Sequence, residues 1–225
     1  MSTVGQLFRE EAAPGRPRLA PVEIGNTPIP IAATQYEEQI QAIVHQLFFS
    51  RETPVVRNVA FVAAEAETQI APLCLQVAQA LAAESRYDVA LIDAGCGEAL
   101  QVSLRVSPPV RKEPSWSLAP RLWLIPRQSW WSQGAPAPTD REMDQLRQLM
   151  SDFDCSVLCS AAGSSLATRA ARVCDGIVLV LTANKTRRPV ATQLKEQIGR
   201  SSIPLLGSVL VERRFPVPEG LYRSL

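Results

Sequence analysis

The chain has 225 residues, of which 46% are hydrophobic and 20% charged, and its formal net charge at pH 7 is +1. This length favours one α/β domain with a sizeable core, and the near-neutral charge argues against recruitment of nucleic acid or acidic lipid by a global field. We find no signal-peptide pattern and no apolar run of about 18 to 20 residues that would span a bilayer. We therefore expect a cytoplasmic protein that meets a membrane only peripherally, through a partner.

Basic charge is concentrated in residues 183–225, which contain eight Lys or Arg and three Glu, a net charge of +5. This part of the chain either meets an acidic partner or a membrane surface, or is an ordinary solvated surface. The five cysteines show no framework spacing, which suggests buried, reduced thiols. With a single histidine in the chain, we predict no metal site.

Residues 1–32 contain five prolines and little periodicity, so we interpret them as a proline-rich mobile leader before a single domain at 33–225. In that domain, helical periods alternate with apolar runs. The predicted helices are 36–49, 73–83, 140–150, 166–173 and 189–198, and the predicted strands are 59–63, 89–92, 122–125, 155–159, 177–181 and 205–211. This alternation predicts an α/β fold with a doubly wound, mainly parallel sheet and helices on both faces.

A loop at residues 64–72 lies between the first predicted strand and the next helix, where a phosphate-binding P-loop belongs in such a fold. A P-loop uses glycines to bring backbone N–H groups onto phosphates, a lysine to reach the terminal phosphates, and a hydroxyl to bind Mg²⁺. Here residues 64–72 read AEAETQIAP, without a glycine, a lysine or a hydroxyl at the end. The sequence therefore predicts a P-loop NTPase-like fold that has lost nucleotide chemistry.

Three other strings follow the same order of elements. They are YDVALIDA at 87–94, CDGIVLVL at 174–181 with KTRR at 185–188, and LGSVL at 206–210 with RRFPVPEGLY at 213–222. Together, in register, they make the chain from about residue 36 onward resemble the bacterial tyrosine autokinase branch of the deviant-Walker ATPases. This resemblance implies a cytoplasmic protein at the inner face of the membrane, working beside a membrane co-polymerase in capsule and exopolysaccharide assembly.

The resemblance also implies that the phosphate-binding positions are degenerate. The family's loop glycines fall on Glu67 and Gln69, its lysine on Ile70, and its Ser-Thr pair on Ala71 and Pro72. Ile70 removes the cation that reaches the phosphates, Ala71 removes the hydroxyl ligand of Mg²⁺, and Glu67 adds a negative charge that repels a polyphosphate. Pro72 removes a further N–H from the helix start. We therefore expect ATP and Mg²⁺ binding to be lost, with no catalytic residue.

Two residual motif positions follow from the same alignment. Asp93 keeps the first of two family aspartates after the second strand, while the second falls on Gly95. Cys159 stands where the Walker B strand should end in an aspartate, and a thiol is a poor substitute for a hard oxygen ligand of Mg²⁺. Asp93 is either a residual Mg²⁺ or water ligand, or a cap for nearby backbone.

The remaining candidates concern modification and partners. Autokinases of this branch carry a tyrosine cluster at the tail, whereas this chain offers only Tyr222 there. The tryptophan pair at 130–131 either forms an exposed docking patch or packs in the core. Candidate partner contacts are Trp130, Trp131, Arg187, Arg188, Arg213 and Arg214.

We therefore expect a catalytically inactive autokinase-like subunit that acts as an interaction or regulatory partner in exopolysaccharide or capsule biosynthesis and export. Its partner is expected to be a membrane polysaccharide co-polymerase or an active ATPase paralogue, and not nucleic acid. Two alternatives stay open. One is an active autokinase or ATPase that uses displaced residues such as Lys185, Arg187 and Arg188, and the other is a partition or positioning adaptor of the wider superfamily.

Overall fold

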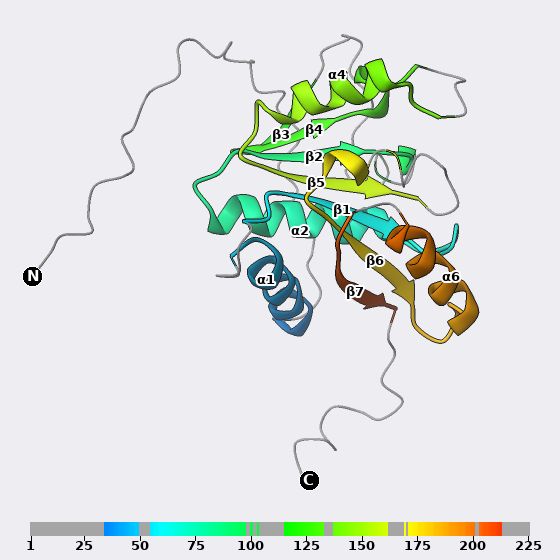
Figure 1. Ribbon diagram of the computed structural model, residues 1–225. Helices are drawn as coiled ribbons and strands as arrows, with labels where there is room; N and C mark the ends of the chain where they lie inside the picture. The colour runs from blue at the N-terminus through cyan, green and yellow to red at the C-terminus, as the bar shows by residue number, and fades with distance from the viewer. Residues whose placement is uncertain are drawn as a thin grey trace, which may run out of the picture.

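The computed structural model describes residues 34–49, 55–97, 100, 103, 115–132, 137–161, 169, 171–200 and 203–212, so the expected leader at 1–32 lies outside it. The described residues build a seven-stranded sheet with the order β3-β4-β2-β5-β1-β6-β7 (Figure 1). The strands are β1 Asn58–Ala63, β2 Val89–Asp93, β3 Trp116–Ala119, β4 Leu122–Ile125, β5 Cys155–Ser160, β6 Gly176–Thr182 and β7 Leu205–Val211. Neighbouring strands are parallel except β3 and β4, which are antiparallel. The predicted mainly parallel sheet is confirmed.

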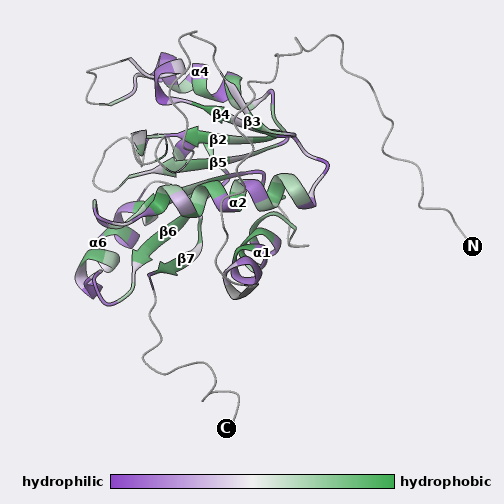
Figure 2. Cartoon of the chain, turned by 180° about the vertical axis from the view of Figure 1, so that it is seen from behind, coloured by the Kyte–Doolittle hydropathy of each residue, from purple (hydrophilic) through white to green (hydrophobic). Residues whose placement is uncertain are grey.

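Helices cover both faces of this sheet. They are α1 Thr34–Phe48, α2 Ile70–Glu84, α4 Asp140–Met150 and α6 Arg188–Gly199, with short 3-10 helices η1 Arg127–Ser129 and η2 Ala171–Val173. Alternate residues of β1 point to opposite faces, so that Phe61 joins the core under α1 and α2 while Val62 joins the core under α4 and α6. Burial on both sides explains why the strands are hydrophobic throughout, whereas α1 and α4 also present hydrophilic residues (Figure 2).

The structure departs from the predicted elements in two described places. β3, at Trp116–Ala119, was not expected, and it is the antiparallel edge strand. Helix α2 begins at Ile70, three residues before the expected start at 73, so the candidate loop is shorter than the sequence suggested. Of the helix expected at 166–173, the described part contains η2, while residues 166–168 and 170, like Gly163, Ser164 and Ser165, lie outside the described residues.

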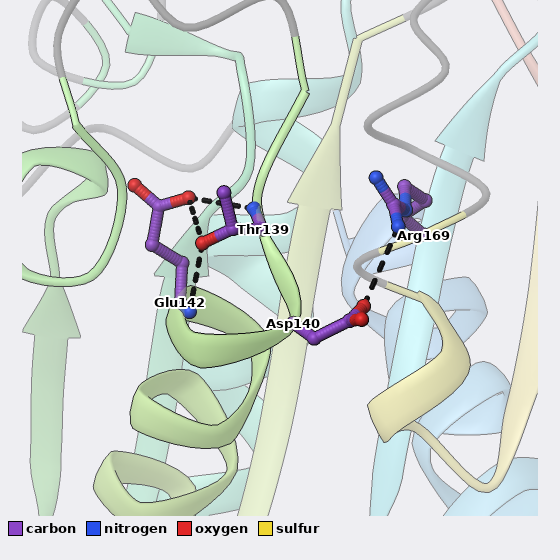
Figure 3. A network of polar contacts seen from close by, with 4 residues as sticks. All are labelled: Thr139, Asp140, Glu142 and Arg169. Atoms are coloured by element: carbon purple, nitrogen blue, oxygen red, sulfur yellow. Dashed lines mark hydrogen bonds and ion pairs between the residues drawn. The ribbon is translucent and has the colours of Figure 1, made fainter.

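Helix α4 begins at a capping box (Figure 3). Glu142 Oε2 accepts a hydrogen bond from the Thr139 backbone N–H at 2.6 Å, and Thr139 Oγ1 accepts one from the Glu142 N–H at 3.4 Å. Glu142 Oε1 also accepts from the Ser132 N–H at 2.8 Å. Hydrogen bonds from Ser132 and Thr139 lower the pKa of Glu142 to about 2. Asp140 forms an ion pair with Arg169 at 3.4 Å, beside η2.

Candidate functional site

The candidate site is the loop at residues 64–69, which joins β1 to α2. β1 lies inside the sheet between β5 and β6, and the loop leaves its carboxyl end. Ligands of open parallel sheets bind at this end of the strands, so the loop has the position of a nucleotide site. The predicted loop positions lie together here, at the start of α2: Glu67, Gln69, Ile70, Ala71 and Pro72.

Backbone donors of the loop are already used within the protein. The Ala64 N–H donates to the Val180 carbonyl of β6 at 2.9 Å. Inside the loop, the Thr68 N–H donates to the Glu65 carbonyl at 3.1 Å, and the Ile70 N–H donates to the Thr68 carbonyl at 2.9 Å. A P-loop instead directs such N–H groups at phosphate oxygens. These three donors are therefore not directed at a ligand.

Side chains tie the loop to the end of β6 through four residues, Glu65, Thr68, Thr182 and Thr186, which we call the loop–β6 network. The hydroxyl oxygens of Thr68 and Thr182 lie 3.1 Å apart, and the two residues are 6% and 3% exposed. Thr186 Oγ1 accepts a hydrogen bond from the Thr182 N–H at 2.9 Å and donates one to Glu65 Oε2 at 2.9 Å. Polar groups that could face a ligand thus bind one another.

The first residues of α2 are apolar and buried. Ile70 and Ala71 are 3% and 1% exposed, and both belong to the core on the α1 side of the sheet. Gln69, at the N-cap, makes no side-chain hydrogen bond to the helix. The resemblance to the autokinases predicts that Ile70 and Ala71 stand where that family has its phosphate-binding lysine and Mg²⁺-binding serine. The start of α2 therefore presents neither an ammonium group nor a hydroxyl group at these positions.

Asp93 organises the turn that follows β2. Its Oδ1 accepts hydrogen bonds from the N–H groups of Gly95, Cys96 and Gly97 at 3.0, 2.8 and 3.1 Å. Gly95 and Gly97 have φ angles of 114° and 38°, a region that glycine adopts without strain. This geometry is that of a backbone cap, the second of the two roles considered for Asp93.

Cys159 lies beside Asp93, because the two residues are partners in the β2–β5 ladder. Its thiol is fully buried, and burial, followed by hydrogen bonding with Cys74, raises its pKa well above the usual value. Hydrogen bonding with Cys159 and burial also raise the pKa of Cys96. All three thiols are free, and among the described residues no group of His, Cys, Asp and Glu is arranged to hold a metal ion. Three free thiols, those of Cys74, Cys96 and Cys159, therefore lie together with raised pKa values beside Asp93.

The tryptophan pair does not form an exposed docking patch. Trp130 is 1% exposed and Trp131 is 6% exposed, and both pack in the core on the α4 side. Their rings stack with centroids 6.0 Å apart, and the Arg127 guanidinium lies 3.5 Å from the centroid of Trp131. The core-packing alternative is the correct one, because both indoles are buried and the Arg127 guanidinium lies over the ring of Trp131.

The basic candidates differ in their surroundings. Arg187 and Arg188 are exposed at the N-terminus of α6. Lys185, in the preceding turn, forms an ion pair with Glu212 at 2.7 Å. Arg213, Arg214 and Tyr222 lie outside the described residues.

Sequence reasoning missed the loop–β6 network. Thr186 belongs to the KTRR string at 185–188, but no role was assigned to it, and Thr182 closes a strand that looked purely apolar. A threonine at a strand end followed by another four residues later was the available signal, because a hydroxyl there can accept a hydrogen bond from a preceding backbone N–H.

None of the helices in the described ranges has the length and apolar character that a membrane span requires.

Solved structures share this architecture. The chimerical protein CapA2B2 matches with a TM-score of 0.64 at 14% identity, covering 77% of this chain and 83% of that one. The kinase domain of the Escherichia coli tyrosine kinase Etk gives a TM-score of 0.59 at 17% identity and coverages of 82% and 80%. A ParA family ATPase from Chlorobium tepidum gives 0.54 at 17% identity and coverages of 69% and 74%. No protein-family model and no curated protein sequence matches the chain.

This chain has a P-loop ATPase-like fold. Tyrosine kinase domains and ParA-like ATPases both occur among the similar structures, as the resemblance to the deviant-Walker ATPases predicted. At identities of 14 to 17%, these likenesses concern the fold. They leave the chemistry of the site to the residues of this chain.

Proposed function

We propose that this protein is a catalytically inactive relative of the tyrosine autokinases that accompany polysaccharide assembly. It acts as an interaction or regulatory subunit in exopolysaccharide or capsule biosynthesis and export. The observation that carries the proposal is the loop–β6 network, in which the former phosphate loop bonds to its own protein. The tyrosine kinase domains among the similar structures support the relation to tyrosine kinases.

Charge in the loop supports loss of nucleotide binding. The loop carries two carboxylates. Glu65 accepts a hydrogen bond from the Thr186 hydroxyl and Glu67 is exposed, so a triphosphate bound here would meet two negative charges. At the aligned lysine position, the loop offers the buried side chain of Ile70. Repulsion between like charges a few ångströms apart costs on the order of 1 to 4 kcal/mol near a protein surface. Without a compensating cation, the loop disfavours a polyphosphate.

Magnesium chemistry lacks its usual oxygen ligands for similar reasons. Ala71 supplies no hydroxyl and Cys159 no carboxylate, while Asp93 Oδ1 is occupied by three backbone N–H groups. Mg²⁺ prefers hard oxygen ligands in near-octahedral geometry, usually provided by carboxylates, waters and substrate phosphates. We therefore expect neither ATP nor Mg²⁺ as a cofactor.

Isothermal titration calorimetry with ATP and Mg²⁺ tests this proposal. We expect no binding heat up to millimolar ATP, with the Etk kinase domain measured in the same buffer as the matched control. Micromolar binding by this chain would contradict catalytic loss. An accompanying assay with radiolabelled ATP, comparing the wild type with Tyr222→Phe, tests the active-enzyme alternative, because only a working kinase gives label that depends on Tyr222.

The proposed partner is a membrane polysaccharide co-polymerase or an active ATPase paralogue. Deleting the gene should lower the amount of surface polymer, and the wild-type gene should restore it. Affinity purification after in-cell cross-linking should recover an integral membrane protein or a second P-loop protein. Unchanged polymer in the deletion strain would contradict a role in polysaccharide assembly.

A partition or positioning adaptor is the second candidate, because a ParA family ATPase is among the similar structures. Gene neighbourhood separates the two. Glycosyltransferase and export genes beside this gene support the polysaccharide role, whereas division or partition genes support the adaptor role.

A further inference from the structure

A groove of about 490 Å³ lies beside the last strand of the sheet. Residues from α1, the start of α2 and the end of β7 line it, and we call it the α1/β7 groove. Its apolar lining residues include Ile40, Ile43, Leu73, Val209 and Val211. Among the described residues, nothing fills it.

β7 forms one edge of the sheet and pairs only with β6 in the part of the chain that the structure describes. The Val211 carbonyl accepts a hydrogen bond from the Ala183 N–H at 2.9 Å, which directs the backbone groups of Val211 toward β6. Since these groups alternate along a strand, those of Ser208 and Leu210 point away from the sheet. Leu210 is also 51% exposed. An exposed apolar edge of this kind is normally covered.

The residues that follow β7 in the sequence have a pattern that fits pairing with its outer edge. Glu212 lines the groove and has a φ angle of 56°, a left-handed conformation that turns the chain at the end of β7. The next residues, 213–218, read RRFPVP. In an extended segment, residues two apart direct their N–H groups to the same side. Phe215 and Val217 can thus donate toward β7, while the alternating prolines, which have no N–H, occupy the outward positions.

We propose that residues 215–218 pair with the outer edge of β7 in the same chain as an antiparallel strand. The outward groups of Leu210 then bond to Phe215, and those of Ser208 to Val217, across a connection of residues 211–214, a common hairpin length. Phe215 covers the exposed side chain of Leu210, and Pro216 lies on the opposite face over the α1/β7 groove. Proline at the new edge leaves few free donors there, which ends the sheet.

Pairing within one chain is favoured over pairing with a second copy. The connection is so short that the local concentration of residues 215–218 at β7 is on the order of millimolar or more. Two molecules in dilute solution do not reach that concentration. Pairing between copies would also make protection of β7 depend on protein concentration, which gives a direct distinction.

Amide hydrogen exchange measured by NMR on the full chain tests the proposal. The Ser208 and Leu210 amides should exchange at least about tenfold more slowly than unprotected amides. Val217→Pro, which removes an inward donor, should abolish that protection, whereas the matched change Pro216→Val, which alters an outward position, should preserve it. Fast exchange of both amides in the wild type, or equal effects of the two changes, would overturn the proposal.

A cross-link provides a second, independent measurement. Gln39 and Gln41 are both exposed on α1, but Gln39 lines the α1/β7 groove and Gln41 does not. Gln39→Cys combined with Pro216→Cys should form a disulfide within one chain under mild oxidation by Cu²⁺-phenanthroline and oxygen, and Gln41→Cys with Pro216→Cys should not. A disulfide only between two chains would overturn the same-chain pairing. Neither measurement depends on nucleotide, so failure here is distinct from failure of the proposed function.

Discussion

The hydroxyl groups of Thr68 and Thr182 lie 3.1 Å apart in the protein interior, although 114 positions separate them in sequence. One belongs to the loop that precedes α2 and the other ends β6. Their contact, with that between Glu65 and Thr186, fixes the loop against the sheet. Under the proposed function, these contacts within the protein stand where contacts to a ligand would otherwise lie.

The contribution of this hydroxyl pair can be measured. Thr68→Val leaves the buried Thr182 hydroxyl without that partner, so it should lower the free energy of unfolding by about 1 to 2 kcal/mol. Thr68→Val combined with Thr182→Val should cost less than the sum of the single changes, with a coupling of about 1 kcal/mol. Urea denaturation of the four proteins gives the coupling, and Ser208→Ala, at an exposed position, is the control. Simple additivity would contradict a direct interaction.

Asp93 should matter for stability through its backbone contacts. Asp93→Ala removes an acceptor for three N–H groups and should cost about 2 to 4 kcal/mol, because charge-assisted hydrogen bonds each contribute more than neutral ones. Asp93→Asn keeps one side-chain oxygen as an acceptor, so it should lower the free energy of unfolding by less than Asp93→Ala. Thermal unfolding monitored by circular dichroism measures both. Equal losses for Ala and Asn would argue against the cap.

Placing a carboxylate at the position of Cys159 should destabilise the protein. Cys159→Asp places an acid in a fully buried site where the native thiol already has a raised pKa, and it should cost about 3 kcal/mol or more at pH 7. Cys159→Ala, a control that introduces no charge, should cost about 1 kcal/mol because it leaves a small cavity. Because the buried acid resists ionisation, the defect of Cys159→Asp should lessen as the pH falls toward 5. A stable Cys159→Asp protein with Mg²⁺ affinity would contradict this prediction.

Glu142 gives a prediction about acid stability. Its pKa in the folded protein is about 2, below the ordinary value of 4.5, because Ser132 and Thr139 donate hydrogen bonds to its carboxylate. The ionised carboxylate therefore stabilises the fold above pH 4.5, and this contribution is lost as the pH falls from 4.5 to 2. Glu142→Gln should cost about 1 to 2 kcal/mol at pH 7. The difference from the wild type should vanish near pH 2, which denaturant titrations across this range can check.

The sequence was sufficient for the parallel strands of the sheet because its interior strands are hydrophobic on both faces, as parallel strands between two helix layers must be. β3 escaped prediction for a physical reason: it is a short edge strand with a register irregularity between Ser117 and Ala119, and its pairing with β4 depends on tertiary context. Trp130 and Trp131 were ambiguous because tryptophan suits both cores and interfaces, and only the structure shows that both are buried in the core on the α4 side.

The residue types at the candidate site could be read from the sequence, whereas the contacts between them could not. Ile70 and Ala71 reveal by residue type alone that a lysine and a serine are absent. The bond from Thr186 to Glu65 joins residues 121 positions apart, and no local pattern announces such a contact. Residue types such as Ile70 and Ala71 can thus be read from the sequence, whereas the hydrogen bond between Thr186 and Glu65 is seen only in the structure.

β1 pairs with β5 and β6, both of which lie roughly 100 residues later in the chain. During synthesis, this strand leaves the ribosome long before β5 and β6 have been made. Until then it has no strand to pair with, and its apolar side chains stay exposed. Folding of such a topology is slow and depends on late-arriving segments. Any fragment that stops before β6 should therefore be a client of chaperones and a target for proteases.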